Sequence, residues 1–299
     1  MTATDNIEVP SAGPSTIPAA VRRKRRRREK WGTPWLYLPL SGALVLMVVP
    51  FLWMLSGSLK PEAEIRRVPP TLIPSNLTAV NYSELFGKLD FLAMFVNSVA
   101  VAAAVTAGNL VFCSMLGYAL AKLEFRGRQA VFVLVISTLM VPALVTFVPL
   151  YVLMTNLGMT DSLLGLILPF LATPFGVFLM RQFMQTLPDE LIDAARVDGC
   201  GELAIFWRVI LPLTKPALAA LGIFSFLGSW NNFLWPLVVA QNEEQYTLPV
   251  GLALISSGQD FTRFGVLLAG ALVVLTPMVV VFLLFQRHFI AGIATTGLK

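Results

Sequence analysis

Residues 187–216 read LPDELIDAARVDGCGELAIFWRVILPLTKP, a long polar interruption in a chain that is otherwise built of apolar runs. Pro188 suits the first position of a helix, where its missing N–H is not needed. Glu190 follows in the first turn, where a carboxylate favours the positive end of the helix dipole. Gly199 suits the left-handed residue that ends a helix. We therefore predict a helix from Pro188 to residue 198, a tight turn, and a second helix over 202–210.

The first of these helices is predicted to present one apolar face. Leu187, Leu191, Ala194 and Ala195 recur at helical spacing. The small side chains of Ala194 and Ala195 would let another backbone approach closely. Two short helices between apolar segments therefore predict a docking element at a membrane surface.

The composition identifies a polytopic membrane protein. Hydrophobic residues make up 56% and charged residues 13%, with a mean hydropathy of +0.74, whereas soluble domains carry about 25% charged residues. About 20 apolar residues cross a bilayer as a helix, so we predict an all-α fold with six transmembrane helices. None of the six segments contains Asp, Glu, Lys or Arg in its interior; they are 35–59, 91–121, 130–153, 162–180, 217–240 and 264–286.

The distribution of basic residues predicts the orientation. With the amino terminus inside, 17 of the 22 Lys and Arg residues fall on the inner side, as the positive-inside rule expects of cytoplasmic loops. Both termini and residues 187–216 are then cytoplasmic. Residues 1–34 are predicted to be a disordered basic tail before a membrane domain over 35–299. Its run of seven basic residues, 22–28, is interpreted as a cytoplasmic anchor on anionic lipid; a nucleic-acid patch is the other interpretation of the charge.

Several kinds of chemistry are not indicated. Cys113 and Cys200 lie in different regions and His288 is the single histidine, so neither a structural disulfide nor a metal site is expected. The sequence contains no G-x-x-x-x-G-K-[ST], no G-x-S-x-G and no H-E-x-x-H motif. We therefore expect a chain that is not itself an enzyme and binds no cofactor.

Residues 187–216 resemble the cytoplasmic EAA loop of ATP-binding-cassette (ABC) importer permeases. The stretch 193–195, Asp-Ala-Ala, corresponds to E-A-A, and 198–200, Asp-Gly-Cys, corresponds to D-G-A. Asp193 is one methylene shorter than the usual Glu, and Cys200 replaces Ala. Further stretches are similar to the maltose-type carbohydrate branch: GYALAK at 117–122, WNNFLWPL at 230–237 and YTLPVGL at 246–252.

This resemblance implies a type I ABC importer permease fold with a cytoplasmic coupling helix, in the inner membrane of a bacterium. The implied function is the permease subunit of an ATP-driven sugar importer, which forms half of the translocation path. The implied partners are a second permease, two ATPase subunits that bind ATP and Mg²⁺, and an extracytoplasmic sugar-binding protein. The implied ATPase-docking residues are Glu190, Asp193, Ala194, Ala195, Asp198, Gly199 and Cys200.

A candidate substrate path is indicated by Trp230, Asn231 and Asn232, which are amphipathic or polar groups within an apolar segment. Amides can hydrogen-bond sugar hydroxyls, and an indole can stack on a sugar ring. The alternatives are an interfacial aromatic belt for the Trp and interhelical hydrogen bonds for the amides. Adjacent helical residues point about 100° apart, so we do not expect both Asn side chains to face one cavity.

Three alternative functions remain at this point. The EAA-like loop is shared across branches, so an importer permease for a non-sugar solute such as peptides is the nearest alternative. A secondary transporter usually carries ionisable residues within its spans, and these segments have none. A membrane anchor for a nucleic-acid partner rests on the basic tail alone.

Overall fold

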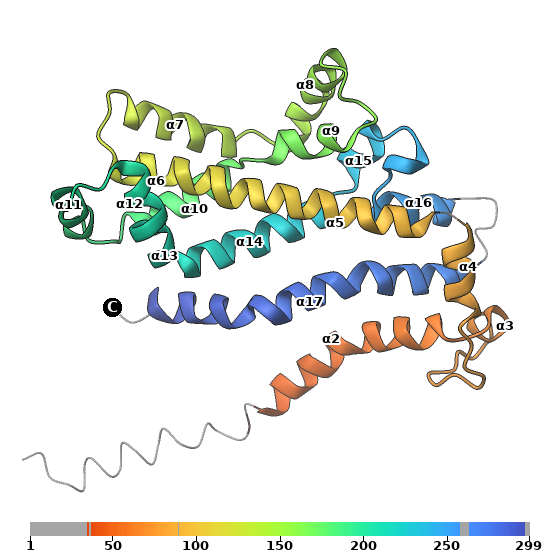
Figure 1. Ribbon diagram of the computed structural model, residues 1–299. Coiled ribbons are helices and arrows are strands. Elements are labelled where there is room, and N and C mark those ends of the chain that lie inside the picture. The colour runs from red at the N-terminus through yellow and green to blue at the C-terminus, as the bar shows by residue number, and fades with distance from the viewer. Residues whose placement is uncertain (1–34, 36, 89, 258–262, 297–299) are drawn as a thin grey trace, which may run out of the picture. The chain divides into compact units, whose positions relative to one another are not determined.

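The computed structural model describes residues 35, 37–88, 90–257 and 263–296. The predicted basic tail, 1–34, lies outside the described residues, so its disorder and its anchoring role stay predictions. In the described part of the chain all regular structure is helical (Figure 1). The chain divides into two units, Met1–Trp53 and Met54–Lys299, and each is described by itself.

The first unit contains most of helix α2 (Tyr37–Ser58). This helix has 22 residues and no charged side chain, with Pro50 inside it. At 1.5 Å per residue it is long enough to cross a hydrocarbon core about 30 Å thick. The first predicted span is therefore confirmed as a helix.

A continuous helix of 32 residues, Phe91–Lys122, forms the centre of the second unit. It consists of α5 (Phe91–Gly108), the π-helical turn η2 (Asn109–Cys113) and α6 (Ser114–Lys122). α14 packs along α5 and α17, while α10 packs on α6 (Figure 1). The other described elements are α3 (Glu62–Ile65), α4 (Val80–Lys88), α7 (Arg128–Leu139), α8 (Ala143–Asn156), α9 (Leu163–Ile167), η3 (Leu168–Phe170), α10 (Pro174–Met184), α11 (Glu190–Val197), α12 (Glu202–Ile205), η4 (Phe206–Ile210), α13 (Leu211–Leu213), α14 (Lys215–Trp230), α15 (Leu234–Val239), η5 (Glu243–Gln245), α16 (Leu248–Ser257) and α17 (Phe264–Thr296).

The third predicted span, 130–153, is formed by two helices that meet at a sharp bend near Pro142. The described residues include four helices long enough to cross a membrane and two bent pairs, which bring the number of candidate spans to six if each pair counts as one. α7 and α8 form the first pair, bent by 103°. Pro142 is the N-cap of α8, and the residue before a proline disfavours helical backbone, so the helix cannot run straight through this point.

The fifth predicted span, 217–240, is wrong at its carboxyl-terminal end. α14 ends at Trp230, and α15 is a separate helix that contains Pro236. A proline inside a continuous helix would remove one backbone hydrogen bond and clash with the carbonyl four residues earlier. At its other end α14 meets the short helices α12–α13 at a bend of 83°.

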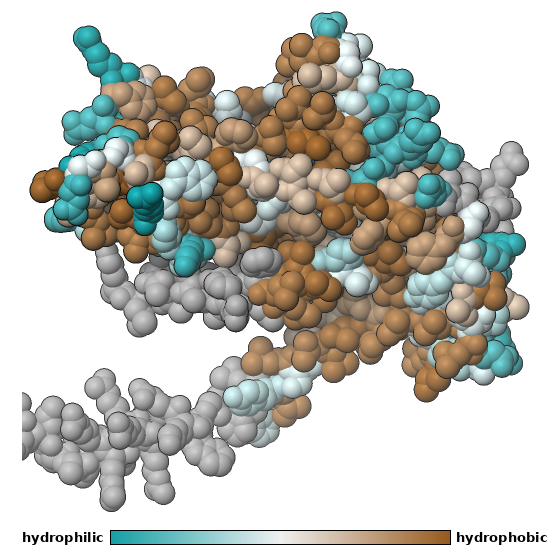
Figure 2. All heavy atoms as spheres, in the orientation of Figure 1, coloured by the Kyte–Doolittle hydropathy of each residue, from teal (hydrophilic) through white to brown (hydrophobic). Residues whose placement is uncertain are grey.

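Hydrophilic surface gathers at the two ends of the second unit's helices, around α11 and α12 at one end and around α3, α4 and η5 at the other (Figure 2). Apolar side chains cover much of the length between (Figure 2). The close contact of α6 with α10 depends on Gly117, because a Cβ added there would lie 2.7 Å from the Cβ of Met180. Small residues allow such approaches between membrane helices.

Candidate functional site

The polar interruption folds as predicted into two short helices joined by a turn. α11 ends at Val197 with Asp198 as its C-cap, and Gly199 follows with the left-handed φ of 81°. The Gly199 N–H donates to the carbonyl of Arg196, and the Cys200 N–H donates to the carbonyl of Ala195, both at 3.0 Å. These bonds satisfy carbonyls at the helix end. α11 begins at Glu190, two residues later than the predicted start at Pro188.

The apolar face predicted for this helix is wrong in part. Ile192 and Ala195 are buried and belong to a cluster with Tyr118 of α6, whereas Leu191 is 41% exposed and Ala194 is also exposed. Residues three apart lie on one face of a helix, and the face that carries Ile192 and Ala195 belongs to a core cluster to which α6 and α10 also contribute. Ala195 is therefore covered by its own chain.

The other predicted docking residues are accessible. Val197, which the sequence reasoning missed, is 88% exposed on the same helix. A single exposed apolar side chain is common on protein surfaces and does not by itself mark a docking site. Cys200 is half-buried, and the remaining residues are exposed: Glu190, Asp193, Ala194, Asp198 and Gly199.

Lys122 connects the start of α11 to the end of α6. Its Nζ lies 2.5 Å from Oδ1 of Asp189 and donates to the carbonyl of Leu187 at 2.6 Å. The Lys122 side chain is 4% exposed, so its charge is held in place. The hydrogen bond from Lys122 and its positive charge lower the pKa of Asp189 below its ordinary value.

Arg196 and Glu202 form a second set of polar contacts among these helices. Arg196 donates to Oε1 of Glu202 at 2.9 Å and to Oδ1 of Asp193 at 3.3 Å. The Tyr118 hydroxyl donates to the other oxygen of Glu202 at 2.6 Å. α6, α11 and α12 are thereby joined by charged and hydroxyl groups. The sequence reasoning missed Tyr118, Lys122 and Glu202, because no local pattern pairs residues about 65 to 85 positions apart.

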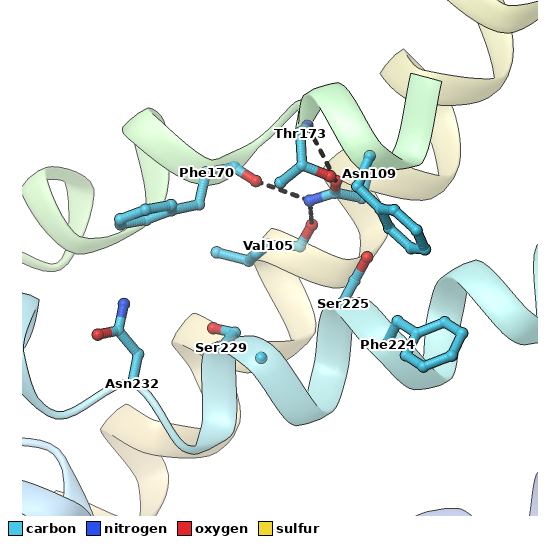
Figure 3. Close-up of a pocket in the computed structure, with 10 residues that line it drawn as sticks. Val105, Asn109, Phe170, Thr173, Phe224, Ser225, Ser229 and Asn232 are labelled. Atoms are coloured by element: carbon cyan, nitrogen blue, oxygen red, sulfur yellow. Dashed lines mark hydrogen bonds between the residues drawn. The ribbon is translucent and has the colours of Figure 1, made fainter. Parts of the chain in front are cut away.

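A cavity of 290 Å³ lies within the membrane-spanning part of the second unit (Figure 3). Its walls come from α5 and η2, from the junction of η3 with α10, and from α14 with the residue pair that follows it. The polar side chains that line it are all neutral: Asn109, Thr173, Ser225, Ser229 and Asn232.

Asn109 is the centre of the hydrogen bonding at this cavity (Figure 3). Its Nδ2 donates to the carbonyls of Val105 and Phe170 at 2.9 and 2.7 Å. Its Oδ1 accepts from the hydroxyl of Thr173 at 2.7 Å and from the Thr173 N–H at 3.2 Å. The amide thus holds the break before α10 against the π-helical turn η2. An amide inside an apolar segment was the available signal for it.

The three predicted path residues lie in different surroundings. Trp230 is 1% exposed and donates from Nε1 to the carbonyl of Val274 at 3.0 Å, in a buried cluster at the far end of the unit from α11. Asn231 is exposed and caps its own helix by donating to Leu227 O at 2.9 Å. Asn232 lines the cavity.

A much smaller space of about 10 Å³ adjoins this cavity and shares Ser229 and Asn232 with it. It is also lined by Ser98 and Thr247. The Thr247 hydroxyl is buried and has no hydrogen-bond partner among the described residues. A space of this size suits about one water-sized group, so hydroxyl and amide groups continue beyond the main cavity.

The comparisons with known proteins agree with this architecture. Residues 113–294 match the family described as binding-protein-dependent transport system inner membrane component. The chain belongs to this family. It is a permease: a multi-pass membrane component rather than the ATPase of an importer.

Two relatives illustrate the similarity. The chain is 42% identical over 258 residues to the arabinooligosaccharides transport system permease protein AraQ of Bacillus subtilis (strain 168), covering 85% of this chain and 92% of that protein. It is 36% identical over 261 residues to the sn-glycerol-3-phosphate transport system permease protein UgpE of Yersinia enterocolitica, with the same coverage.

A third relative and a solved structure extend the comparison. The diacetylchitobiose uptake system permease protein NgcG of Streptomyces coelicolor is 34% identical over 256 residues, covering 85% of this chain and 84% of that protein. The fold resembles a chain in the crystal structure of a bacterial ABC transporter that imports the acidic polysaccharide alginate. The TM-score is 0.76 at 22% identity, covering 87% of this chain and 99% of that one. The predicted importer-permease fold is therefore confirmed.

Proposed function

We propose that this chain is the permease subunit of an ATP-driven importer for a neutral oligosaccharide. Relatives at 34–42% identity are named as permeases for arabinooligosaccharides, diacetylchitobiose and sn-glycerol-3-phosphate. The main support for this proposal is the cavity of 290 Å³, whose polar lining is made of hydroxyls and amides without a charged side chain. Amides and hydroxyls match the hydrogen-bonding groups of a sugar, whereas a phosphate ester is usually held by Arg or Lys.

Asn232 is the path residue in this proposal, with Ser229 beside it. Trp230 takes a packing role, because its indole is stacked on Phe226 with ring centroids 5.6 Å apart and its N–H is already bonded. This placement favours interhelical packing for Trp230 over stacking on a sugar. A peptide importer remains the competing function, and it would transport a solute that carries charged termini.

The coupling proposal places a cytoplasmic ATPase on the exposed face of α11. Glu190, Asp193, Ala194 and Asp198 form that face together with Val197. Movement of α11 would reach α6 through Lys122 and reach α12 through Arg196. The complete machine would contain a second permease, two ATPase subunits that bind ATP and Mg²⁺, and an extracytoplasmic binding protein. In this arrangement both termini of the chain are cytoplasmic.

The test reconstitutes the full complex with its binding protein in proteoliposomes. Uptake and stimulated ATP hydrolysis are measured with a labelled arabinooligosaccharide, diacetylchitobiose, glycerol-3-phosphate and a short peptide. We expect a neutral saccharide to be transported, and Asn232→Leu to lower the ratio of uptake to hydrolysis. Asn231→Leu is the matched control, since Asn231 bonds only within its own helix. Stimulation by the phosphate ester or the peptide alone would overturn the sugar assignment.

A further inference from the structure

An apolar groove of 540 Å³ runs along the membrane-spanning part of the second unit, separate from the cavity at Asn109. Its walls come from α5, η2, η4, α13, α14 and one side chain of α17. Ala219 and Gly222 are among its lining residues, and a Cβ added to Gly222 would come no nearer than 3.8 Å to Leu110. The groove is therefore open because small residues face it.

One end of this groove is positively charged. Lys215, the first residue of α14, and Trp207 of η4 both line it, and both are exposed. Arg208 follows Trp207 in η4 and is exposed as well. Within the described ranges 37–88, 90–257 and 263–296, neither Lys215 nor Arg208 forms an ion pair. Lys215 thus places an uncompensated cation at this end of the groove, and Arg208 follows the groove-lining Trp207 in the chain.

We propose that this groove binds an acyl chain of an anionic phospholipid, with the headgroup phosphate held by Lys215. At membrane depth the medium beside an open apolar groove is hydrocarbon, so an acyl chain fills it without uncovering polar backbone. Trp side chains prefer the headgroup level, and basic pockets beside membrane helices bind anionic headgroups. The uncompensated charge selects an anionic headgroup over a zwitterionic one.

The position of the groove gives this lipid a role. Lys215 lies at the 83° bend between α12–α13 and α14, the point where the coupling helices join the cavity-lining helix. A headgroup held by Lys215 would lie at this bend, beside the start of α14. We therefore expect phosphatidylglycerol to raise ATP-dependent transport by the complex, whichever solute it carries.

The test measures lipid binding to the purified, delipidated transporter complex by native mass spectrometry, with phosphatidylglycerol and phosphatidylcholine as probes. Wild type should bind phosphatidylglycerol more tightly. Lys215→Gln should weaken phosphatidylglycerol binding about fivefold and leave phosphatidylcholine unchanged, while Lys215→Arg should bind as wild type. Gly222→Leu should weaken both lipids by filling the groove. Ala103→Leu, at an exposed position of α5 outside the groove, is the matched control.

Two results would overturn the proposal. One is unchanged phosphatidylglycerol affinity in Lys215→Gln. The other is efficient cross-linking of Gly222→Cys to the second permease in native membranes, which would show that a protein helix occupies the groove. If Gly222→Leu prevents assembly, Lys215→Gln still decides, because it leaves the apolar walls in place.

Discussion

Ala194 and Ala195 are neighbours in sequence with identical side chains, yet they face different surroundings. Ala195 is 8% exposed against the chain's own core, and Ala194 is exposed. Consecutive helical residues point about 100° apart, so only one of them can lie on the buried stripe of α11. The residue that keeps α11 folded and the residue offered to an ATPase are therefore separable.

This separation leads to a paired mutation. Ala195→Asp adds volume and a charge to a packed site, and overpacking alone typically costs about 1–3 kcal/mol, so we expect a lower yield of folded permease. Ala194→Asp should leave the yield unchanged and weaken ATPase binding. Detergent-stable permease and co-purified ATPase are measured for both variants. Equal loss of folded protein in the two variants would contradict the assignment of faces.

A second residue-level prediction concerns Asp161, which closes a loop outside the spans. Its Oδ1 accepts the backbone N–H groups of Gln241 and Asn242 at 2.9 and 3.0 Å. These bonds, the one from Gln241 first, lower the pKa of Asp161 below its ordinary value. Because the pKa of Asp161 is lower in the folded state than in the unfolded state, its ionised carboxylate stabilises the fold at pH values above the unfolded pKa, near pH 4. This stabilisation is lost as the pH falls through the pKa of the folded state.

We therefore expect Asp161→Asn to lower the thermal unfolding midpoint of the complex at pH 6 more than at pH 3.5. The measurement is a melting curve at both pH values, with Glu124→Gln at an exposed position as the control. A deficit in Asp161→Asn of the same size at both pH values would show that the ionised carboxylate is not what holds the loop.

At the scale of elements, interruptions of helices build the cavity. η2 is a π-helical turn inside the 32-residue helix, and π turns often occur at functional sites. η3 and α10 are separated by a break whose backbone groups bond to Asn109. α14 ends at Trp230 and leaves Asn232 to face the cavity. Straight helices at these three places would pack side to side and leave less room between them.

The element-level prediction is that Asn109→Leu destabilises this junction. It removes the donor to the Phe170 carbonyl and the acceptor of the Thr173 hydroxyl, and each buried group left unpaired costs about 1–3 kcal/mol. We expect a lower unfolding midpoint and reduced uptake at unchanged ATPase binding. Asn231→Leu should have little effect on stability. A stable Asn109→Leu permease with normal uptake would remove the junction from the mechanism.

At the scale of the whole molecule, the basic residues predict which end faces the cytoplasm. The two cysteines allow a direct test, since Cys200 is half-buried in the turn after α11 and Cys113 is buried within the long central helix. An impermeant thiol reagent should leave both unlabelled in intact cells. In inside-out vesicles stripped of ATPase it should label Cys200, with Cys113 as the internal unreactive control. Labelling of Cys200 from outside would reverse the proposed orientation.

The sequence by itself determined the class of protein, because apolar segments without charges have few stable solutions other than membrane helices. It also determined the turn at Gly199, since a positive φ strongly favours glycine. The tertiary structure decided which face of α11 is buried, because periodicity finds a helix but not the stripe that meets α6 and α10. It likewise separated Trp230, Asn231 and Asn232, because a hydropathy pattern does not show where a helix ends near Pro236. The cavity and the contacts of Lys122 with Leu187 and Asp189 join residues far apart in sequence. Only the packed chain brings these residues together.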